Sequence, residues 1–334
     1  MGESVGLGLD EGAASTPLIP GIHHVTAISG PAQANLDFYA GVLGLRMVKR
    51  TVNFDDPGTY HLYYGDRVGT PGTIMTFFPW ERAEPGRRGS GFTGATSFAV
   101  PAGSGDFWAG YLERAGVAGV EREVRFGADI VRLGDPDGLA LELVAGPDTR
   151  ETPAGLPVHP DIPPGHAIRS FHGVLLDVAD PDASARLLTD LLGYEHIGEE
   201  GGRLRFRTGE GEVGAVVDLL TAGSSEDGRM GKGSVHHVAF RARDDDEQQT
   251  WREAVASAGI SVTTVQDRNY FRSIYFHEPG GVLFEIATDG PGFTADETEK
   301  NLGGDVKLPA WLEGRRAELE SRLPPLTLPH GNAG

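Results

Sequence analysis

The stretches Gly21-Ile-His-His-Val-Thr-Ala-Ile28 and Ser234-Val-His-His-Val-Ala-Phe240 decide the fold of this chain. Each carries two adjacent histidines, His23-His24 and His236-His237, within the same strand-like run of apolar residues. The later stretch is followed by Glu285, which lies in a further apolar run. One histidine pair is most often ordinary packing or surface. Two pairs in matching positions, with a glutamate that needs a partner if it is buried, indicate a metal site.

The same pattern recurs four times along the chain. Each segment starts with a short apolar strand, continues with an amphipathic helix that ends in glycine, and closes with further strands. The four helices are expected to end at Gly44, Gly116, Gly193 and Gly259. The sequence therefore predicts an α+β fold of four tandem βαβββ modules, which form two cupped mixed β-sheets flanked by helices.

Composition places the boundaries between the modules and the flanking segments. Residues 21–146 hold modules 1 and 2, and residues 167–289 hold modules 3 and 4. The proline-rich residues 147–166 have the composition of a linker. Residues 1–20 are predicted to be a flexible N-terminal tail. Residues 290–334 are predicted to be a C-terminal extension with one helix over 309–323, where proline stands at the first helical position.

The candidate metal ligands follow from superposing the modules on one another. His24 and His237 occupy the same position in the first strands of modules 1 and 4, where modules 2 and 3 carry Ser97 and Gly173. Since strand side chains alternate between faces, equivalent positions point into the same concave surface. A centre with two histidines requires modules 1 and 4 to pair in one cup and modules 2 and 3 in another. We predict His24, His237 and Glu285 as the ligands.

The counterparts of Glu285 in the other modules decide how many ligands the centre has. Superposing the final strands on their turns places Phe77, Glu142 and Asp218 opposite Glu285. We expect Glu142 and Asp218 to be edge or salt-bridged carboxylates. Phe77 cannot bind a metal, so the centre keeps two imidazoles and one carboxylate. That donor set leaves positions open and suits Fe(II).

Charge and composition exclude several classes of partner. A formal net charge of −19 argues against nucleic acid and anionic membranes as partners, because both are bound by basic surfaces. The chain has no cysteine, which excludes disulfides, thiolate metal sites and cysteine nucleophiles. No stretch has the pattern of a signal peptide or the length of a bilayer span, and we expect a cytoplasmic protein that does not enter a membrane.

Longer motifs in modules 1 and 4 carry a resemblance to a known family. Tandem βαβββ modules with these His and Glu positions resemble the vicinal oxygen chelate superfamily of glyoxalases, bleomycin-resistance proteins and extradiol dioxygenases. Within it, the chain is most similar to the para-hydroquinone ring-cleaving dioxygenases, such as the 2,6-dichlorohydroquinone 1,2-dioxygenases. The motifs are Phe38-Tyr-Ala-Gly-Val-Leu-Gly-Leu-Arg46, Thr51-Val-Asn-Phe-Asp-Asp-Pro57, Thr59-Tyr-His-Leu-Tyr-Tyr-Gly65, Gly69-Thr-Pro-Gly-Thr-Ile-Met-Thr-Phe-Phe-Pro-Trp80, Asp267-Arg-Asn-Tyr-Phe-Arg-Ser-Ile-Tyr-Phe276 and Glu278-Pro-Gly-Gly-Val-Leu-Phe-Glu285.

The resemblance also implies roles for single residues. It implies Fe(II), with Mn(II) as the alternative, at His24, His237 and Glu285, in agreement with the assignment from the modules. It further implies supporting roles beside the metal for His23, Thr26, His236 and Arg268, and a pocket role for Tyr275. An imidazole is suited to take and return a phenol proton, and Arg268 would supply a fixed positive charge. The alternatives are a plain strand residue for Thr26 and a structural ion pair for Arg268.

Three functions remain open. The resemblance favours an Fe(II)-dependent extradiol-type dioxygenase that cleaves the ring of hydroquinones, chlorinated or otherwise substituted ones included. A small aromatic diol and O₂ would be its substrates, and acceptance of catechols stays open. The second function is a metal-dependent isomerase or lyase of the glyoxalase type, which commonly has a fourth protein ligand where Phe77 stands. The third is a non-catalytic, small-molecule-binding resistance protein. A homo-oligomer is compatible with the sequence.

Overall fold

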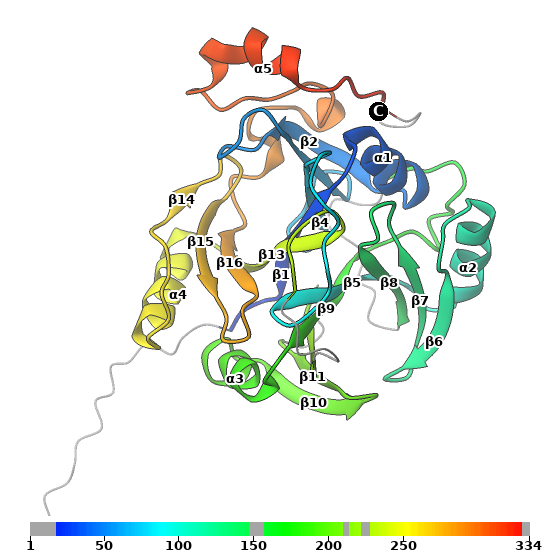
Figure 1. The fold of residues 1–334 in the computed structure, drawn as a ribbon, viewed down its shortest axis with the longest axis vertical. Coiled ribbons are helices and arrows are strands. Elements are labelled where there is room, and N and C mark those ends of the chain that lie inside the picture. The colour runs from blue at the N-terminus through cyan, green and yellow to red at the C-terminus, as the bar shows by residue number, and fades with distance from the viewer. Residues whose placement is uncertain (1–17, 147–156, 210–213, 222–227, 329–334) are drawn as a thin grey trace, which may run out of the picture.

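Four βαβββ modules follow one another along the chain (Figure 1). The computed structural model describes residues 18–146, 157–209, 214–221 and 228–328. Module 1 comprises β1 (Ile22–Ser29), α1 (Ala32–Leu36), β2 (Arg46–Val52), β3 (Tyr60–Gly65) and β4 (Ile74–Pro79). Module 2 comprises β5 (Phe92–Pro101), α2 (Gly105–Arg114), β6 (Glu121–Arg125), β7 (Ala128–Gly134) and β8 (Ala140–Gly146). Module 3 comprises β9 (Ser170–Val178), α3 (Pro181–Arg186), β10 (Glu195–Glu200), β11 (Arg203–Arg207) and β12 (Val216–Thr221). Module 4 comprises β13 (Ser234–Ala242), α4 (Asp245–Ser257), β14 (Gln266–Asp267), β15 (Arg272–His277) and β16 (Leu283–Thr288).

The strands form two curled, mixed sheets of eight strands each. The first sheet has the order β14-β15-β16-β13-β1-β4-β3-β2 and the second the order β10-β11-β12-β9-β5-β8-β7-β6. The first sheet therefore combines modules 4 and 1, and the second combines modules 3 and 2. Both the predicted α+β fold and the predicted pairing of the modules are confirmed. Each sheet joins strands from both halves of the chain, so the halves at 21–146 and 167–289 describe chain order rather than separate sheets.

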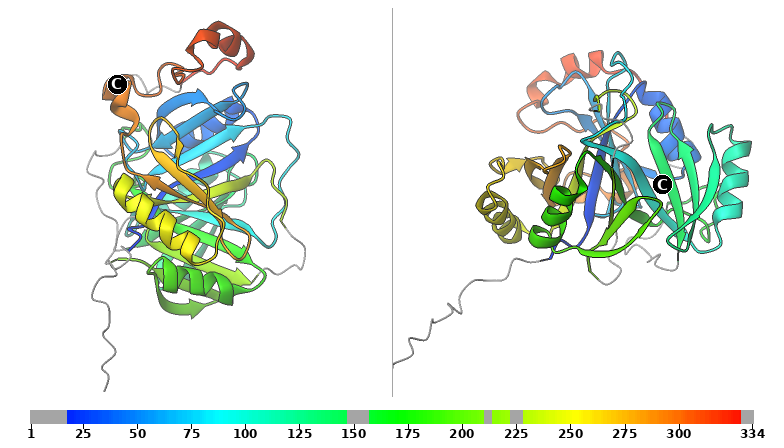
Figure 2. Two further views of the ribbon diagram at one scale, coloured as in Figure 1. Left: turned by 90° about the vertical axis from the view of Figure 1, so that its left-hand side faces the viewer. Right: turned by 60° about the horizontal axis from the view of Figure 1, so that its bottom comes forward.

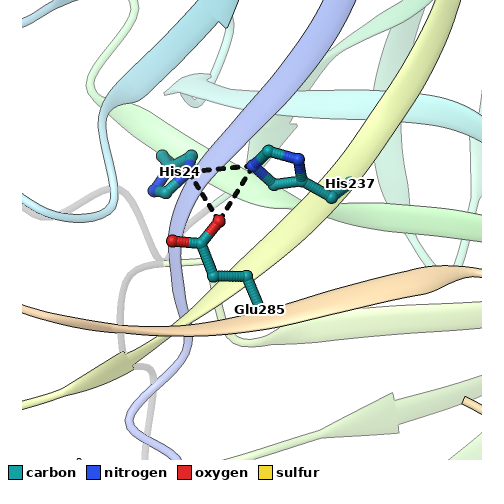
Figure 3. Close-up of side chains that lie close together, drawn as sticks. All are labelled: His24, His237 and Glu285. Atoms are coloured by element: carbon teal, nitrogen blue, oxygen red, sulfur yellow. Dashed lines mark hydrogen bonds and ion pairs between the residues drawn. The ribbon is translucent and has the colours of Figure 1, made fainter. Parts of the chain in front are cut away.

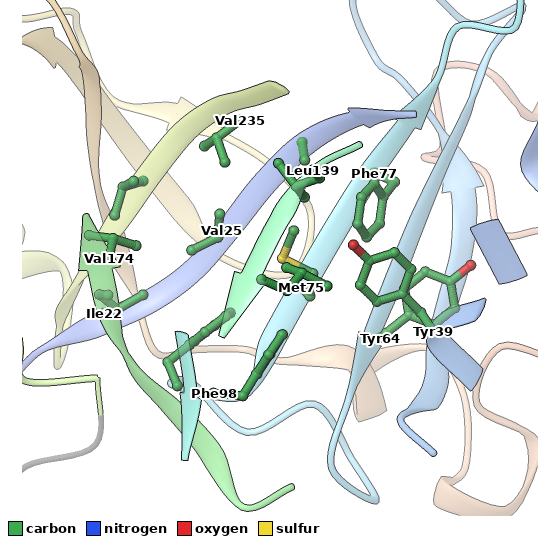
Figure 4. Packing of buried hydrophobic residues seen from close by; sticks show 14 of the residues in the cluster. Ile22, Val25, Tyr39, Tyr64, Met75, Phe77, Phe98, Leu139, Val174 and Val235 are labelled. Atoms are coloured by element: carbon green, nitrogen blue, oxygen red, sulfur yellow. The ribbon is translucent and has the colours of Figure 1, made fainter. Parts of the chain in front are cut away.

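The first strands of the modules lie at the centre of each sheet. In the first sheet, β1 and β13 run antiparallel and are flanked by β4 and β16, each parallel to its neighbour. Every residue of β1 is buried. Its outward residue Val25 packs with Met75 and Val235, near Phe98 and Val174 of the second sheet (Figure 4). The alternate side chains of β1 then face the concave side of the first sheet.

The helices flank the two sheets (Figure 2). The helical segments that begin with α1 and α3 continue as π-helical turns over Asp37–Val42 and Leu187–Leu191. Helix α4 is tied to the strands behind the candidate site, because the Gln248 side-chain amide donates to the Ile286 carbonyl at 2.8 Å and to the Arg272 carbonyl at 2.7 Å. Among the described helices, none is long and apolar enough to cross a bilayer.

The segments at the module boundaries are partly packed. Residues 1–17 of the predicted tail and residues 147–156 of the predicted linker lie outside the described residues. Ile19, at the end of the predicted tail, is buried, and its carbonyl accepts a hydrogen bond from Thr208 at 2.6 Å. Ile162 of the linker is also buried. The packed chain therefore begins before residue 20 and includes the second half of the linker.

The C-terminal extension lies against the edge of the first sheet. Lys49, which is fully buried on β2, donates to Asp296 at 2.5 Å and to Glu297, and also to the Phe293 carbonyl at 3.1 Å. Further along, Val306 forms a parallel bridge with Arg50 of β2. The extension thus covers an edge strand that would otherwise leave backbone groups unpaired.

The predicted helix of the extension is shorter than expected. The α-helix α5 spans Arg316–Arg322, and a 3₁₀ turn over Glu313–Arg315 precedes it. Gly314 lies within that turn, and glycine is a poor helix former. The residues 309–312 form turns rather than the first turn of a helix.

Replacing Lys49 by methionine is expected to destabilise the protein by about 3–5 kcal/mol, because the buried Glu297 carboxylate loses its charge partner. The free energy of unfolding, measured by urea denaturation of the metal-free protein, tests this. The matched control is Lys307→Met, since Lys307 is more exposed and lies 3.9 Å from the same carboxylate. The control should cost less than about 1 kcal/mol. Equal losses in both variants would contradict the expectation.

Candidate metal centre

Three side chains from distant parts of the chain converge in the cup of the first sheet. His24 on β1, His237 on β13 and Glu285 on β16 are all buried and point toward one another (Figure 3). The two Nε2 atoms lie 3.3 Å apart. The Oε2 atom of Glu285 lies 3.4 Å from Nε2 of His24 and 2.9 Å from Nε2 of His237. In the described part of the chain, no other three His, Asp or Glu side chains bring their ligand atoms within 4.8 Å of one another.

The strand register explains why residues so far apart in sequence meet. In the antiparallel pair of β1 and β13, Thr26 lies opposite His237 and His24 lies opposite Ala239. The two histidines are therefore diagonal neighbours on one face. Strand β16 runs parallel to β13 and places Glu285 opposite Ala239. A slip of one residue in either pairing would turn a ligand to the other face of the sheet.

Each histidine pair forms a hydrogen bond between its own two rings. The Nδ1 atoms of His23 and His24 lie 2.9 Å apart, and those of His236 and His237 lie 2.8 Å apart. In both pairs the second histidine therefore uses Nδ1 toward its neighbour and Nε2 toward the centre. A second histidine that donates from Nδ1 keeps a lone pair on Nε2, which is the tautomer that a metal ligand requires.

The electrostatics of His237 and Glu285 favour the protonation states of metal ligands. Burial lowers the pKa of His237, and the nearby Glu285 carboxylate offsets part of that effect. Burial alone would raise the pKa of Glu285, but the imidazoles of His24 and His237 outweigh it and hold the pKa well below its usual range. A neutral imidazole and an ionised carboxylate are the states that bind a cation.

The geometry of this group fits a metal ion. Ligand atoms about 2.1 Å from an ion and at right angles to one another lie about 3.0 Å apart. The three observed separations bracket that value. The other oxygen of Glu285 accepts a hydrogen bond from Ser273 at 2.5 Å, which orients the carboxylate. Three electron-rich atoms in a buried place need a cation between them. His24, His237 and Glu285 could therefore hold one metal ion on one face of its coordination sphere.

A cavity of about 500 Å³ opens next to this group. The side chains of His24, His237 and Glu285 are part of its wall. Aromatic and aliphatic side chains make up much of the remainder, with Phe78, Trp80, Phe271 and Leu283 among them. The volume and the apolar walls suit a small ring-shaped molecule that reaches the three polar groups with one edge.

Three of the other predicted site residues line the cavity, and two do not. His236, Arg268 and Tyr275 line the cavity. The Arg268 guanidinium donates to the Tyr275 hydroxyl at 3.1 Å and to the Asp55 carboxylate at 3.3 Å. Arg268 therefore forms an ion pair and also lies in the cavity wall. Burial is the main cause that raises the pKa of Tyr275.

His23 and Thr26 are buried behind this wall rather than in it. His23 reaches the centre only through its hydrogen bond to His24. Thr26 donates to, or accepts from, the Thr76 hydroxyl at 3.0 Å. Neither residue is part of the cavity lining. A role for either one would have to act through its hydrogen-bond partner.

The ladder register corrects the expected counterpart of Glu285 in module 1. In module 4, Glu285 lies opposite Ala239, the second residue after the histidine. In module 1, the equivalent residue Thr26 lies opposite Thr76, not Phe77. The alignment on the Pro-Gly turns was wrong by one residue, because the turn before β4 and the turn before β16 differ in length.

Phe77 instead faces the core. Its ring packs 4.4 Å from the ring of Tyr39 and 6.0 Å from that of Tyr64 (Figure 4). The candidate centre therefore keeps three protein side chains as its expected ligands, since the Thr76 hydroxyl is held by other partners. A similar shift applies to module 2, where Glu142 lies opposite Ser97, so Ala95 rather than Ser97 corresponds to the histidines.

The cup of the second sheet has a different chemistry. The Glu142 carboxylate pairs with Arg125 at 2.9 Å and with Arg203 at 3.2 Å. The Asp218 carboxylate forms a two-bond pair with Arg205, both contacts at 2.8 Å. These carboxylates are salt-bridged, as expected. Arginine pairs directly with the carboxylates of this cup, whereas the neighbours of Glu285 in the first cup are two imidazoles.

His61 is a cavity residue to which the sequence reasoning assigned no role. Its ring lines the cavity and packs 4.4 Å from the ring of Phe78. Burial, and then His24 and His237, lower its pKa well below the usual value. The one signal in the sequence is its position two residues before Tyr63 on β3, which places both side chains on the concave face.

Replacing Glu285 by glutamine is expected to weaken metal binding by more than about 100-fold, since a neutral amide removes the only anionic ligand. Metal content after anaerobic loading with Fe(II) and dialysis measures this. His237→Ala should behave in the same way. Glu142→Gln, which changes the equivalent carboxylate of the second cup, is the matched control and should keep about one metal ion per chain. Metal retained by Glu285→Gln at the level of the control would contradict the assignment.

Two sequence relatives are similar to this chain over most of its length. A chlorohydroquinone/hydroquinone 1,2-dioxygenase of Sphingobium indicum is 34% identical over 310 residues, which cover 90% of this chain and 95% of the relative. MhqO of Bacillus subtilis, provisionally named a ring-cleaving dioxygenase, is 49% identical over 305 residues, 91% of this chain and 96% of the relative.

Solved structures and a family model agree with these relatives. The crystal structure of a provisionally named dioxygenase from Bacillus subtilis superposes with a TM-score of 0.88 at 47% identity, over 93% of this chain and 99% of that one. Glyoxalase I of Zea mays shares the fold, with a TM-score of 0.58 at 16% identity over 80% of this chain and 92% of its own. The model of the glyoxalase family matches residues 21–143 and 170–286. The chain therefore belongs to the Glyoxalase/Bleomycin resistance protein/Dioxygenase superfamily.

Proposed function

We propose that this protein is an Fe(II)-dependent, extradiol-type dioxygenase that opens the aromatic ring of hydroquinones with O₂. The observation that carries the proposal is the buried group of His24, His237 and Glu285 in the wall of a cavity with aromatic sides. Relatives named ring-cleaving dioxygenases, one of them for hydroquinone, support ring cleavage as the reaction class. A small aromatic diol and O₂ are then the substrates.

The donor set supports iron. Two imidazoles and one carboxylate hold a divalent ion through one face and leave the other positions for exogenous ligands. When bound, Fe(II) would supply the redox-active centre at which a phenolate and O₂ meet. Mn(II) has similar ligand preferences and is the alternative.

The cavity residues supply the remaining chemistry. If His237 donates from Nδ1 to Nδ1 of His236, the neutral His236 ring carries its own proton on Nε2. His236 can then donate a hydrogen bond to an anionic oxygen in the cavity and return a proton to it. Arg268 adds a fixed positive charge in the same wall, next to the Tyr275 hydroxyl. These two donors stabilise negative charge on a ring oxygen as the ring opens.

A glyoxalase-type isomerase has less support. That chemistry commonly uses a fourth protein ligand, and the counterpart of Glu285 in module 1 is Thr76, whose hydroxyl bonds to Thr26 and His61. The likeness to glyoxalase I of Zea mays is one of fold alone. A non-catalytic binding protein would not need a complete set of three metal ligands.

Oxygen uptake separates these functions. The protein is loaded anaerobically with Fe(II), mixed with hydroquinones and catechols, and exposed to O₂, while O₂ consumption and ring-opened product are measured. The proposal expects one O₂ consumed per ring opened with hydroquinone. Isomerisation of a thiol adduct of an aldehyde without O₂ uptake would favour the isomerase. No turnover with Fe(II), together with tightly held zinc, would contradict the proposal.

His236→Ala and Arg268→Ala are expected to keep the metal and slow ring cleavage by about 100-fold or more, because each removes a donor for the developing anion. Metal content is measured beside the rate, since changes around a metal site also weaken binding. The matched control is His172→Ala, the equivalent position to His236 in the second cup, which should keep the wild-type rate. Loss of metal by His236→Ala, with metal and activity retained by His237→Ala, would reverse the assignment within the pair.

A further inference from the structure

A chain of four hydrogen-bonded side chains crosses the module 1 side of the cavity. The Tyr63 hydroxyl lies 2.8 Å from Nδ1 of His61. Nε2 of His61 lies 2.7 Å from the Thr76 hydroxyl, which lies 3.0 Å from the Thr26 hydroxyl. Tyr63, Thr76 and Thr26 are buried and His61 is half-buried, and both His61 and Tyr63 line the cavity. This arrangement is a hydrogen-bonded polar site beside the apolar side chains of Phe78 and Phe271 in the cavity wall.

The chain occupies the place of a missing carboxylate. Thr76 is the counterpart of Glu285, and Tyr63 lies opposite Thr76 as Tyr275 lies opposite Glu285. Module 4 therefore carries Glu285 and Arg268 in the cup, whereas strands β3 and β4 of module 1 carry neutral hydroxyls and the imidazole of His61. The carboxylates of Asp55 and Asp56 in the cavity wall come from the segment between β2 and β3. In the sheet, strands β4 and β3, which carry Thr76 and Tyr63, lie on the other side of the central pair β13 and β1 from β16, which carries Glu285. A molecule bound at the centre therefore has this neutral polar site on its far side from Glu285.

The hydrogen-bond pattern leaves the Tyr63 hydroxyl able to form one more hydrogen bond. A neutral imidazole donates through only one nitrogen. Either Tyr63 donates to Nδ1 while Nε2 donates to Thr76, or Thr76 donates to Nε2 while Nδ1 donates to Tyr63. In the first arrangement the Tyr63 oxygen can accept another hydrogen bond, and in the second its hydroxyl can donate one. The site therefore suits an oxygen that can play either role.

We propose that Tyr63, held by His61, is the subsite that binds the second hydroxyl of the aromatic diol. This inference rests on the proposed function, since it assumes a diol whose first hydroxyl is directed to the metal centre. Tyr63 would contact the substrate, and His61 is a positioning residue that fixes the Tyr63 hydroxyl. The subsite would select diols over phenols that have only one hydroxyl.

Other polar groups of the cavity are less suited to this task. Arg268 and Tyr275 bond to each other on the module 4 side, beside the ligands His237 and Glu285. Asp55 lies at the mouth with 79% of its side chain exposed, so water competes for it. A buried hydroxyl discriminates more strongly, because a substrate without the matching group leaves it unpaired.

The test compares two ligands and several variants. Anaerobic calorimetry on the Fe(II)-loaded protein gives the dissociation constants of hydroquinone and of 4-methylphenol, in which a methyl group replaces the second hydroxyl. In Tyr63→Phe the preference for hydroquinone over 4-methylphenol should fall by on the order of 10-fold, through the hydroquinone value alone. His61→Leu should lose a similar factor. His61→Gln should keep most of the preference, because an amide can donate to one hydroxyl and accept from the other.

Tyr64→Phe is the matched control. Tyr64 is the next residue of β3, is equally buried, and donates to Asn35 at 3.0 Å on the opposite face. It should leave the preference unchanged. A Tyr63→Phe variant that binds both ligands as the wild type does, or weakens both equally, overturns the subsite.

Different results would contradict the proposed function and the proposed subsite. A wild-type protein that takes up no O₂ with any hydroquinone overturns the proposed function. A wild-type protein that cleaves hydroquinone, with an unchanged preference in Tyr63→Phe, overturns only the subsite. For cleavage, the supporting result is a rise in the KM for hydroquinone by a similar factor in Tyr63→Phe, with metal content equal to that of the wild type.

Discussion

The antiparallel pairing of β1 with β13 is the constraint on which the rest of the structure depends. It joins the first and the last module into one sheet and makes His24 and His237 diagonal neighbours on its concave face. Behind this face, Val25 and its neighbours pack against the second sheet, so the register is fixed by apolar burial as well as by hydrogen bonds. Burial of the three converging donor atoms is unfavourable by itself. The packing of the two sheets holds them together, which is the arrangement expected of a cation site.

In the two cups, the same fold surrounds a buried carboxylate with different partners. In the second cup, arginines neutralise Glu142 and Asp218 in the metal-free protein itself. Such pairs compensate the charge of both carboxylates with guanidinium groups. In the first cup, Glu285 lies beside two imidazoles, and burial lowers the pKa of one of them, that of His237. The difference between the salt-bridged cup and the candidate metal centre therefore lies in a few side chains on equivalent strands.

The sequence predicts the fold and the pairing of the modules well, because both follow from patterns that repeat. Helix-ending glycines and strand periodicity recur in each module, and only two modules carry histidine pairs. The errors arise where one module departs from the others. Phe77 was aligned to Glu285 through Pro-Gly turns, but strand register depends on turn length, and the structure puts Thr76 there. His61 had no repeated counterpart, and its two hydrogen bonds join residues 15 and 2 positions away. No periodicity marks such a contact.

Position 76 also explains how one fold can support different reactions. A carboxylate there could act as a fourth protein ligand, which would take one of the open positions of the centre and raise its negative charge. Threonine does neither, and its hydroxyl instead joins His61 and Thr26 in a neutral chain. The module 1 side of the cavity is then left for exogenous oxygen ligands and for hydroxyl groups of a substrate. With Arg268 and His236 on the other side, the cavity has donors suited to an anionic ring oxygen in one place and the Tyr63 hydroxyl, suited to an uncharged oxygen, in another. A diol that ionises at one end only matches this division.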